Sequence, residues 1–453
     1  MRRISKMATA AAAVAAGAAL LTACGTSVGQ QTPTAPTPER VQTPHPGKLL
    51  TGNAAIIGDW RSDAPSVRRK IAFSDLPAPY ATRSSNNQPH LTPRPDGAMP
   101  VVPTHFKVQL YATGLGGARH LTTAPNGDIF VTESGANDIK ILRGVDSNGK
   151  ALQSSVFVTG LHQPFGVAFY PKGPNPQYVY IANTDSVIRY PYKNGDLVAT
   201  GDVENIVPDI PGGGHLAGGG HWTRDIAFSQ DNSKMFVSVG SHSNVDDSPA
   251  EYHRADILQY NPDGTGFRIY ASGIRNPVGI TVDPKTGILW TSVNERDDIG
   301  DYLPSDYITH VEDGGFYGWP WYYLGSHQDP RHQGEHPELA GHVIMPDVLL
   351  QAHSASLQMA FYNGSQFPKY YQGGAFACEH GSWNRSHRTG YKVVFVPMKS
   401  GKALGEYVDF MTGFVVDDGN VWGRPVGVTV GGDGSLYISD DASNSVWRIS
   451  YIG

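Results

Sequence analysis

A pattern of short strands recurs six times between residue 106 and the C-terminus. Each copy holds an apolar strand, a polar turn and a second strand that leads into a third. One such unit cannot cover both faces of its own sheet, whereas six units packed around an axis can. The sequence therefore predicts an all-β fold, a six-bladed β-propeller. The copies are Ala118–Val131, Gln163–Ile181, Asp225–Val239, Asn276–Ser292, Gln358–Ala377 and Pro425–Ser439.

A β-sandwich is the alternative reading of the same turn signals. The propeller is favoured because each copy is longer than a hairpin and keeps the same internal order. Propellers close when a strand from before the first blade pairs with the last blade. Residues Phe106 to Tyr111 precede the first copy, and we expect them to supply that strand.

Composition supports an all-β reading and excludes one class of function. The chain has 53 glycines and 33 prolines but only 17% charged residues, as loop-rich β proteins do. Its net charge of −6 lacks the basic excess that nucleic-acid binding requires.

The first residues are typical of an export signal. A basic start precedes an apolar run, Ala8 to Leu21, which is too short to span a bilayer comfortably. It ends in Leu-Thr-Ala-Cys and resembles a bacterial lipoprotein box, with lipid on Cys24. The alternative is an ordinary secretory signal with a chance cysteine. We therefore expect an extracytoplasmic protein that is lipid-anchored to the bacterial cell membrane.

Four segments are expected along the chain. Residues 1–23 are the signal peptide and residues 24–46, rich in Thr, Pro and Gln, are a disordered tether. Residues 47–100 are an irregular wrap whose apolar side chains could pack on the main body. Residues 101–453 form the propeller.

Polar residues stand just before the innermost strand of most copies. A packed core would place apolar side chains there, and in a propeller these positions converge at one end of the channel. They would gather a histidine base and several cations, which suit an anionic ligand. No glycine signature of a nucleotide site is present, so a polycarboxylate cofactor fits better. The pairs are His162-Gln163, His221-Trp222, Arg275-Asn276, Ser354-Ala355 with His353 beside it, and Gly423-Arg424.

Several motifs spread over residues 106–450 resemble one family. The chain is similar to the glucose/sorbosone dehydrogenases, six-bladed propellers that use pyrroloquinoline quinone (PQQ) and calcium, and more to the sorbosone-type branch. The motifs are Gly219-Gly220-His221, Ser272 to Pro277, Asn294 to Asp298, Gly315 to Pro320, His380 to Arg385 and Gly423-Arg424-Pro425.

The resemblance implies a role for each matching residue. His221 matches the general base that takes a proton from the sugar hydroxyl, and a histidine pKa suits that task. Arg275 and Asn276 match a pair that contacts the quinone carbonyls. Arg424 matches a cation that holds a cofactor carboxylate. The remaining implied cofactor contacts are a second cation, either Arg388 or Arg385, and a glutamine for which Gln163 is the nearest candidate.

The resemblance also implies calcium. The backbone carbonyls of Glu295 and Arg296 match the calcium site beside the quinone, and oxygen ligands suit this ion. A second, structural calcium would use Asp306 and Tyr317. The chain departs from the family there, because the usual Asp-Glu pair is replaced by Asp306-Tyr307.

The sequence as a whole predicts a quinoprotein that oxidises an aldose or aldehyde sugar, sorbosone-like or glucose-like, and passes electrons to an external acceptor. Two alternatives stay open. One is a calcium-dependent lactonase or hydrolase built on Glu133, Asn183 and Asp440, which we place at the far end of a strand from the polar positions. The other is a non-catalytic ligand-binding propeller.

Overall fold

The computed structural model describes residues 47–212 and 220–453, which belong to one compact unit, Gln42–Gly453. The predicted signal peptide, Cys24 and the tether lie outside the described residues. Within the described ranges no helix is both long enough and apolar enough to cross a bilayer.

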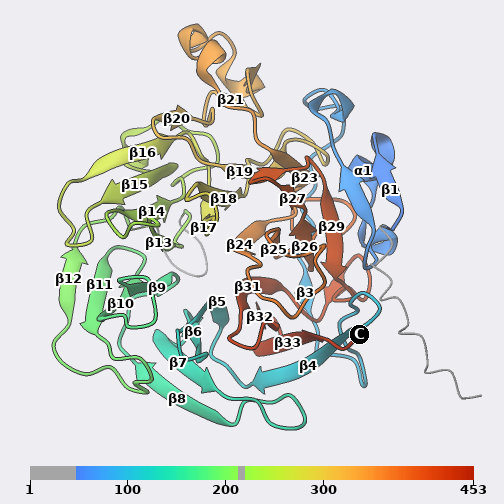
Figure 1. Ribbon diagram of the computed structural model, residues 1–453. Helices are drawn as coiled ribbons and strands as arrows, with labels where there is room; N and C mark the ends of the chain where they lie inside the picture. The colour runs from blue at the N-terminus through green and yellow to red at the C-terminus, as the bar shows by residue number, and fades with distance from the viewer. Residues whose placement is uncertain (1–46, 213–219) are drawn as a thin grey trace, which may run out of the picture. The chain divides into compact units, whose positions relative to one another are not determined.

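Six antiparallel sheets stand around a common axis, which confirms the predicted propeller (Figure 1). The first three blades are β5 (Ala118–Thr123), β6 (Ile129–Glu133), β7 (Asp138–Arg143), β8 (Gln153–Val158); β9 (Val167–Tyr170), β10 (Tyr178–Ala182), β11 (Val187–Pro191), β12 (Glu204–Val207); and β13 (Ile226–Phe228), β14 (Met235–Val239), β15 (Asp256–Tyr260), β16 (Arg268–Ser272). The last three are β17 (Pro277–Val282), β18 (Leu289–Val293), β19 (Ser305–His310), β23 (Val348–Ala352); β24 (Ser356–Phe361), β25 (Ala375–Glu379), β26 (Lys392–Val396), β29 (Tyr407–Met411); and β31 (Pro425–Val430), β32 (Leu436–Asp440), β33 (Ser445–Tyr451), β4 (Phe106–Thr113).

The ring closes as the sequence predicted. β4 comes from before the first blade and pairs antiparallel with β33 along its whole length, from Phe106 opposite Tyr451 to Thr113 opposite Ser445. The N-terminal end of the propeller is thereby hydrogen-bonded to its C-terminal strand.

The second strand of each blade carries the core. In five blades every residue of this strand is buried, and in β10 only the first is partly exposed. Such a strand lies in the middle of its sheet between two neighbouring blades, so both of its faces need apolar side chains. This explains runs such as IFVTE and MFVSV, which do not alternate.

Residues 47–100 have more order than the sequence led us to expect. They contain β1 (Leu49–Thr51), α1 (Asn53–Ile57), η1 (Trp60–Ser62), β2 (Arg68–Lys70), η2 (Phe73–Asp75) and β3 (His90–Leu91). β2 pairs antiparallel with β29 and parallel with β1, so the fifth blade grows to six strands. β3 pairs with β30 (Asn420–Val421).

A buried ionic network fastens this segment to the fifth blade. The Arg69 guanidinium lies 2.6 Å from Asp409 and 2.8 Å from Asp63, and the Lys392 ammonium lies 2.9 Å from each of these carboxylates. All four side chains are buried.

One long excursion leaves the fourth blade between β19 and β23 and projects from the ring (Figure 1). Its elements are β20 (Gly315–Phe316), β21 (Tyr322–Tyr323), β22 (His327–Gln328), η4 (Pro330–His332) and η5 (Pro337–His342). β20 returns to pair with β16 of the third blade. The remaining short elements are η3 (Pro249–Glu251), β27 (Met398–Lys399) and β28 (Lys402–Ala403).

Candidate active site

The polar positions and the ends of the second strands lie at the same end of the ring. Neighbouring strands run in opposite directions, so the start of the innermost strand lies beside the end of the second strand. The register pairs Ala118 with Glu133 and Pro425 with Asp440. We call this end the site face, and the opposite end, with the turns between first and second strands, the turn face. Our placement of Glu133, Asn183 and Asp440 far from the polar positions was therefore wrong.

These three side chains nevertheless do not form a shared metal site. Glu133 accepts a hydrogen bond from the Gly116 amide, and Asn183 Oδ1 accepts one from the His162 amide at 3.1 Å. Asp440 Oδ1 accepts one from the Arg424 amide at 2.8 Å. Each holds a loop of its own blade. Among residues 47–212 and 220–453 no group of three or more His, Cys, Asp or Glu could hold a metal ion.

His221 precedes β13 on the site face. Its Nδ1 lies 2.8 Å from the Ser241 carbonyl oxygen and 3.1 Å from Ser241 Oγ. Because a carbonyl only accepts, Nδ1 carries the proton and Nε2 is the basic nitrogen. Burial, and next the positive charge of Arg275, hold the pKa of His221 well below its usual value. The imidazole is therefore neutral near pH 7.

Arg275 and Asn276 enter the site from the loop before β17. The Arg275 guanidinium donates to the Glu295 carbonyl at 2.6 Å and contacts Asp297 Oδ2 at 3.2 Å. Asn276 is buried, and its Oδ1 has no hydrogen-bond partner in the described part of the chain. A Cβ atom added to Gly240 would lie 2.3 Å from that oxygen and 2.6 Å from His221 Cβ. His221 and Asn276 are thus close neighbours, and Gly240 leaves them room.

A second cluster joins the fifth, sixth and first blades. His380 Nε2 lies 2.9 Å from Asp441, and the same carboxylate pairs with Arg119 at 2.6 Å. The Arg424 guanidinium donates to the His380 carbonyl at 3.2 Å. A cavity of about 220 Å³ lies beside Arg119, Arg424 and Asp441. Burial lowers the pKa of His380 to about 4. Burial by itself would raise the pKa of Asp441, but His380, Arg119 and Arg424 beside it hold that pKa well below its usual value.

Trp222 connects the two clusters. The Arg119 guanidinium lies 5.3 Å from the centre of the Trp222 ring, and Trp222 is the residue after His221. The site face therefore gathers the predicted His221, Arg275, Asn276 and Arg424 around one region. Gln163 precedes β9 at the same end and has a left-handed φ of 47°. Its backbone amide donates a hydrogen bond to Asn137 Oδ1.

Arg385 and Arg388 hold the N-terminal segment. The Arg385 guanidinium is buried and donates to the carbonyls of Ile56 and Gly58 at 2.8 and 3.0 Å. Arg388 is equally buried and donates to Asn87 and Gln88. Both guanidinium groups thus bind oxygen atoms of the protein itself, where we expected one of them to bind a cofactor carboxylate.

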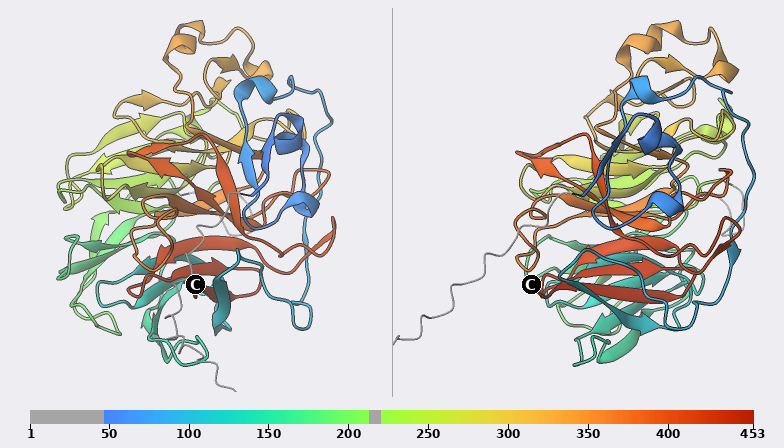
Figure 2. Two further views of the ribbon diagram at one scale, coloured as in Figure 1. Left: turned by 45° about the vertical axis from the view of Figure 1, so that its right-hand side comes forward. Right: turned by 90° about the vertical axis from the view of Figure 1, so that its right-hand side faces the viewer.

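Residues 80–92 cross the site face of the last three blades as a strap. The Tyr80 amide donates to the Ile299 carbonyl at 2.9 Å, and His90 and Leu91 pair with Asn420 and Val421. The right-hand view of Figure 2 shows this light-blue segment along one edge of the ring. Arg388 holds this strap through Asn87 and Gln88, whereas Arg385 binds Ile56 and Gly58, which precede it.

The four predicted metal ligands belong to two expected calcium sites, Glu295 and Arg296 in one and Asp306 and Tyr317 in the other. The Glu295 carbonyl, beside Arg275, remains on the site face. The side chain of Arg296 is directed into the excursion, where it donates to Pro320 and Tyr322. Asp306 accepts backbone amides at the start of β19, whereas the Tyr317 hydroxyl donates to the His310 carbonyl at its end. Four residues of strand separate these two ends by about 13 Å, so the second calcium site is not formed as predicted.

Sequence reasoning missed three groups of the site. Arg119 lies inside β5, two residues past the position that corresponds to Arg424 in the sixth blade. His380 and Asp441 follow second strands, where polar residues also recur in the other blades. A comparison of strand ends, as well as strand starts, would have found His380 and Asp441.

A model of the family described as glucose/sorbosone dehydrogenase matches residues 115–382. The chain belongs to this family. A second model, described as TrAA12-like, matches residues 328–451.

Curated relatives agree with this membership. A PQQ-dependent pyranose dehydrogenase of Coprinopsis cinerea is 26% identical over 409 residues, covering 76% of this chain and 53% of the relative. An uncharacterised protein of Borreliella burgdorferi is 34% identical over 235 residues, covering 51% of this chain and 61% of the relative. The matches thus span little more than half the length of these relatives.

Solved structures share the fold. The PQQ domain of the Coprinopsis cinerea pyranose dehydrogenase has a TM-score of 0.66 at 23% identity, covering 80% of this chain and 99% of that one. The soluble aldose sugar dehydrogenase of Escherichia coli has a TM-score of 0.55 at 18% identity, covering 76% and 99%.

Proposed function

We propose that this protein is a PQQ- and calcium-dependent sugar dehydrogenase that oxidises an aldose or aldehyde sugar, sorbosone-like or glucose-like. The observation that carries the proposal is His221, held neutral with Nε2 as its basic nitrogen, on a face that also presents Arg119, Arg275 and Arg424. Relatives named as PQQ-dependent pyranose dehydrogenase and aldose sugar dehydrogenase support this choice of cofactor and substrate class.

The residues present suit a flat tricarboxylate cofactor. Arg424 donates only to two backbone carbonyls, at 3.2 and 3.4 Å, and forms no ion pair within the described ranges. Its remaining N–H groups can hold a carboxylate, which a guanidinium does with charge-assisted hydrogen bonds. The unpaired, buried Asn276 Oδ1 is a second polar atom that a bound group would satisfy. PQQ, once bound, supplies the acceptor for the hydride.

The chain's own part in the reaction is proton transfer and electrostatics. His221 Nε2 takes the proton of the sugar hydroxyl while a hydride leaves the carbon that bears this hydroxyl. Ser241 keeps the ring in its tautomer and orientation. Arg275 places a positive charge beside the region where negative charge develops on oxygen, and a preorganised charge of this kind lowers the barrier.

Calcium would be held by backbone oxygens at Glu295 and Arg296. Oxygen donors suit this ion, and it would act there as a Lewis acid. The Glu295 carbonyl accepts the Arg275 guanidinium at 2.6 Å. Calcium binding is therefore expected to shift the Arg275 side chain.

The test adds PQQ and calcium to the purified protein and follows dye reduction with a panel of aldoses. His221→Gln should lower turnover by at least 10²-fold, the usual contribution of a general base, while PQQ binding is kept. The matched control is His162→Gln, an exposed histidine before β9, which should leave turnover unchanged. Normal turnover in His221→Gln would exclude the base assignment.

We also propose that the protein is extracytoplasmic and anchored by lipid on Cys24. Cys24→Ser should move the protein from the membrane fraction to the soluble fraction. An unchanged distribution would contradict the anchor without affecting the proposed chemistry.

A further inference from the structure

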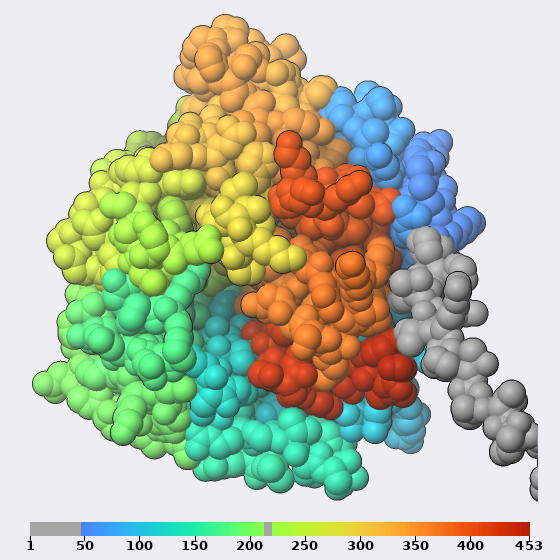
Figure 3. All heavy atoms as spheres, in the orientation of Figure 1, coloured from blue at the N-terminus to red at the C-terminus, as the bar shows by residue number. Residues whose placement is uncertain are grey.

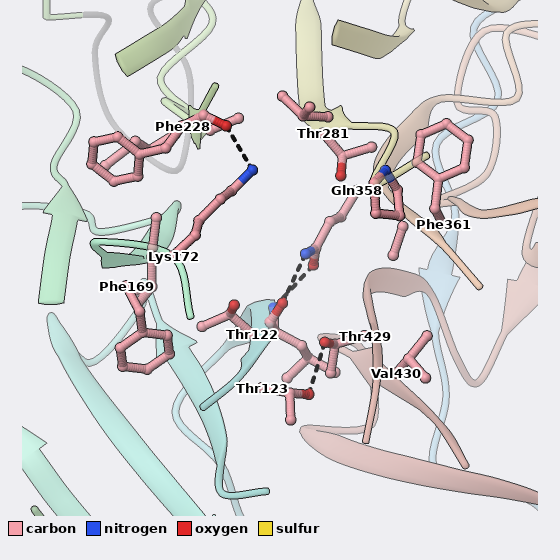
Figure 4. A pocket seen from close by; sticks show the side chains of 18 of the residues that line it. Thr122, Thr123, Phe169, Lys172, Phe228, Thr281, Gln358, Phe361, Thr429 and Val430 are labelled. Carbon is pink, nitrogen blue, oxygen red and sulfur yellow. Dashed lines mark hydrogen bonds between the residues drawn. The ribbon is translucent and has the colours of Figure 1, made fainter. Parts of the chain in front are cut away.

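The central channel holds a chamber on the turn face, away from the site face. It has a volume of about 540 Å³, and its walls are the six innermost strands β5, β9, β13, β17, β24 and β31 (Figure 4). Figure 3 shows its mouth as the hollow at the centre of the ring. A cavity of this volume is in the range of small-molecule sites.

An apolar plug and a polar crossbar separate this chamber from the site face. The plug is a cluster of four buried side chains, each two residues before a residue that lines the chamber: Phe165, Val278, Leu357 and Val426. The crossbar is Gln358, whose side-chain amide bonds to Leu121 N and O at 2.9 and 2.8 Å and to Val428 N at 3.0 Å. Among residues 47–212 and 220–453, the plug and Gln358 thus lie between the chamber and the site face, and the chamber opens to the turn face.

The chamber presents one ammonium and no carboxylate. Among its lining residues Lys172 alone belongs to the Lys, Arg, Asp and Glu group, and His120 is the other titratable one. The Lys172 ammonium donates to the Phe228 carbonyl at 2.7 Å, and Lys172 forms no ion pair in the part of the chain that the structure describes. Two of its three N–H donors remain for a ligand. Burial of the ammonium by the chamber walls lowers the pKa of Lys172, and a bound anion would raise this pKa again.

The rest of the wall suits a hydroxylated carbon chain. Thr123 and Thr429 face each other across neighbouring blades with their hydroxyls 2.9 Å apart, and Thr122 and Thr281 add two more hydroxyls (Figure 4). The rings of the three lining phenylalanines pack between blades instead, Phe169 on Phe130, Phe228 on Tyr180 and Phe361 on Trp290. A cation would lack a counter-charge here, and a polyanion would leave all but one of its charges unpaired.

We propose that this chamber is a binding site for a small hydroxylated monocarboxylate, whose carboxylate pairs with the Lys172 ammonium while its hydroxyls bond to the threonines. The site is separate from the proposed cofactor site. Ligand binding there would depend only on the channel walls, so it can be tested independently of the dehydrogenase activity.

The experiment is calorimetric titration of the full-length protein with D-gluconate at pH 7, with and without PQQ and calcium. We expect one gluconate per chain in both cases and much weaker binding of sorbitol, which has the hydroxyls but no carboxylate. Lys172→Met should lower gluconate affinity at least tenfold with an unchanged melting temperature. Thr429→Val, which leaves the charge in place, should lower it to a smaller extent.

Two controls separate this chamber from other cationic places. Lys285→Met removes an ammonium from the corresponding turn of the fourth blade, between β17 and β18, which does not line the chamber. This variant should bind gluconate as the wild type does. Arg424→Met removes a cation of the site face and should also bind it normally. No gluconate binding, equal binding by Lys172→Met, or loss of binding in Arg424→Met would each overturn the proposal.

Discussion

Substitution of Gly240 by alanine tests whether His221 and Asn276 must keep their present positions for catalysis. Its added Cβ would lie 2.6 Å from His221 Cβ and 2.3 Å from Asn276 Oδ1. Non-bonded carbons rest at about 3.5–4.0 Å, so in Gly240→Ala the imidazole must move by about 1 Å. Gly240 does not have a left-handed φ, so alanine brings the contact without backbone strain. A displacement of about 1 Å at a reacting group costs roughly 10²-fold in rate.

The assay is kcat for aldose-dependent dye reduction after loading with PQQ and calcium. Overpacking of this kind costs about 1–3 kcal/mol of stability, so Gly240→Ala should remain folded with a lowered melting temperature. The control is Gly341→Ala in η5, where an added Cβ meets nothing within 4 Å. A Gly240→Ala protein with kcat within twofold of the wild type would refute the claim that these two residues need their present spacing.

Three further predictions follow from the charges and contacts of the fold. Because burial and Arg275 hold the pKa of His221 well below 6.5, the base stays unprotonated as pH falls, and kcat/KM should decline only well below pH 6.5; an acid limb at or above 6.5 would contradict this. Arg69→Met leaves the buried carboxylates of the N-terminal network without their guanidinium, and urea unfolding should show a loss of about 3–5 kcal/mol. The control Arg61→Met, at an exposed arginine, should leave the urea midpoint unchanged. Arg388→Met removes donors to Asn87 and Gln88, so hydrogen exchange should rise in residues 80–92 and not in β14; equal protection would show that the strap does not need this arginine.

The fold was predictable because its signal is repeated. Six copies of one strand order left few architectures, and Phe106 to Tyr111 had no other copy to join, so the pairing of β4 with β33 followed. The strands in residues 47–70 were not predictable. β2 pairs with β29 across more than 300 residues of sequence, and nothing local in Arg68–Lys70 indicates that partner.

The site was predictable where it depends on position within the repeat. His221, Arg275 and Arg424 each precede an innermost strand, and the structure brings them to one face. Arg385 and Arg388 could not be placed in this way, because their partners belong to residues 47–100, far away in the sequence. The misplacement of Asp440 came from overlooking that antiparallel strands bring their opposite ends together, as its register with Pro425 makes plain.

The most direct test of the whole account is a crystal structure of this protein with PQQ and calcium bound. We expect the quinone on the site face, with a carboxylate on Arg424 and His221 beside the reacting carbonyl. PQQ in the channel chamber, on the outer surface of a blade, or absent from saturated crystals would contradict it.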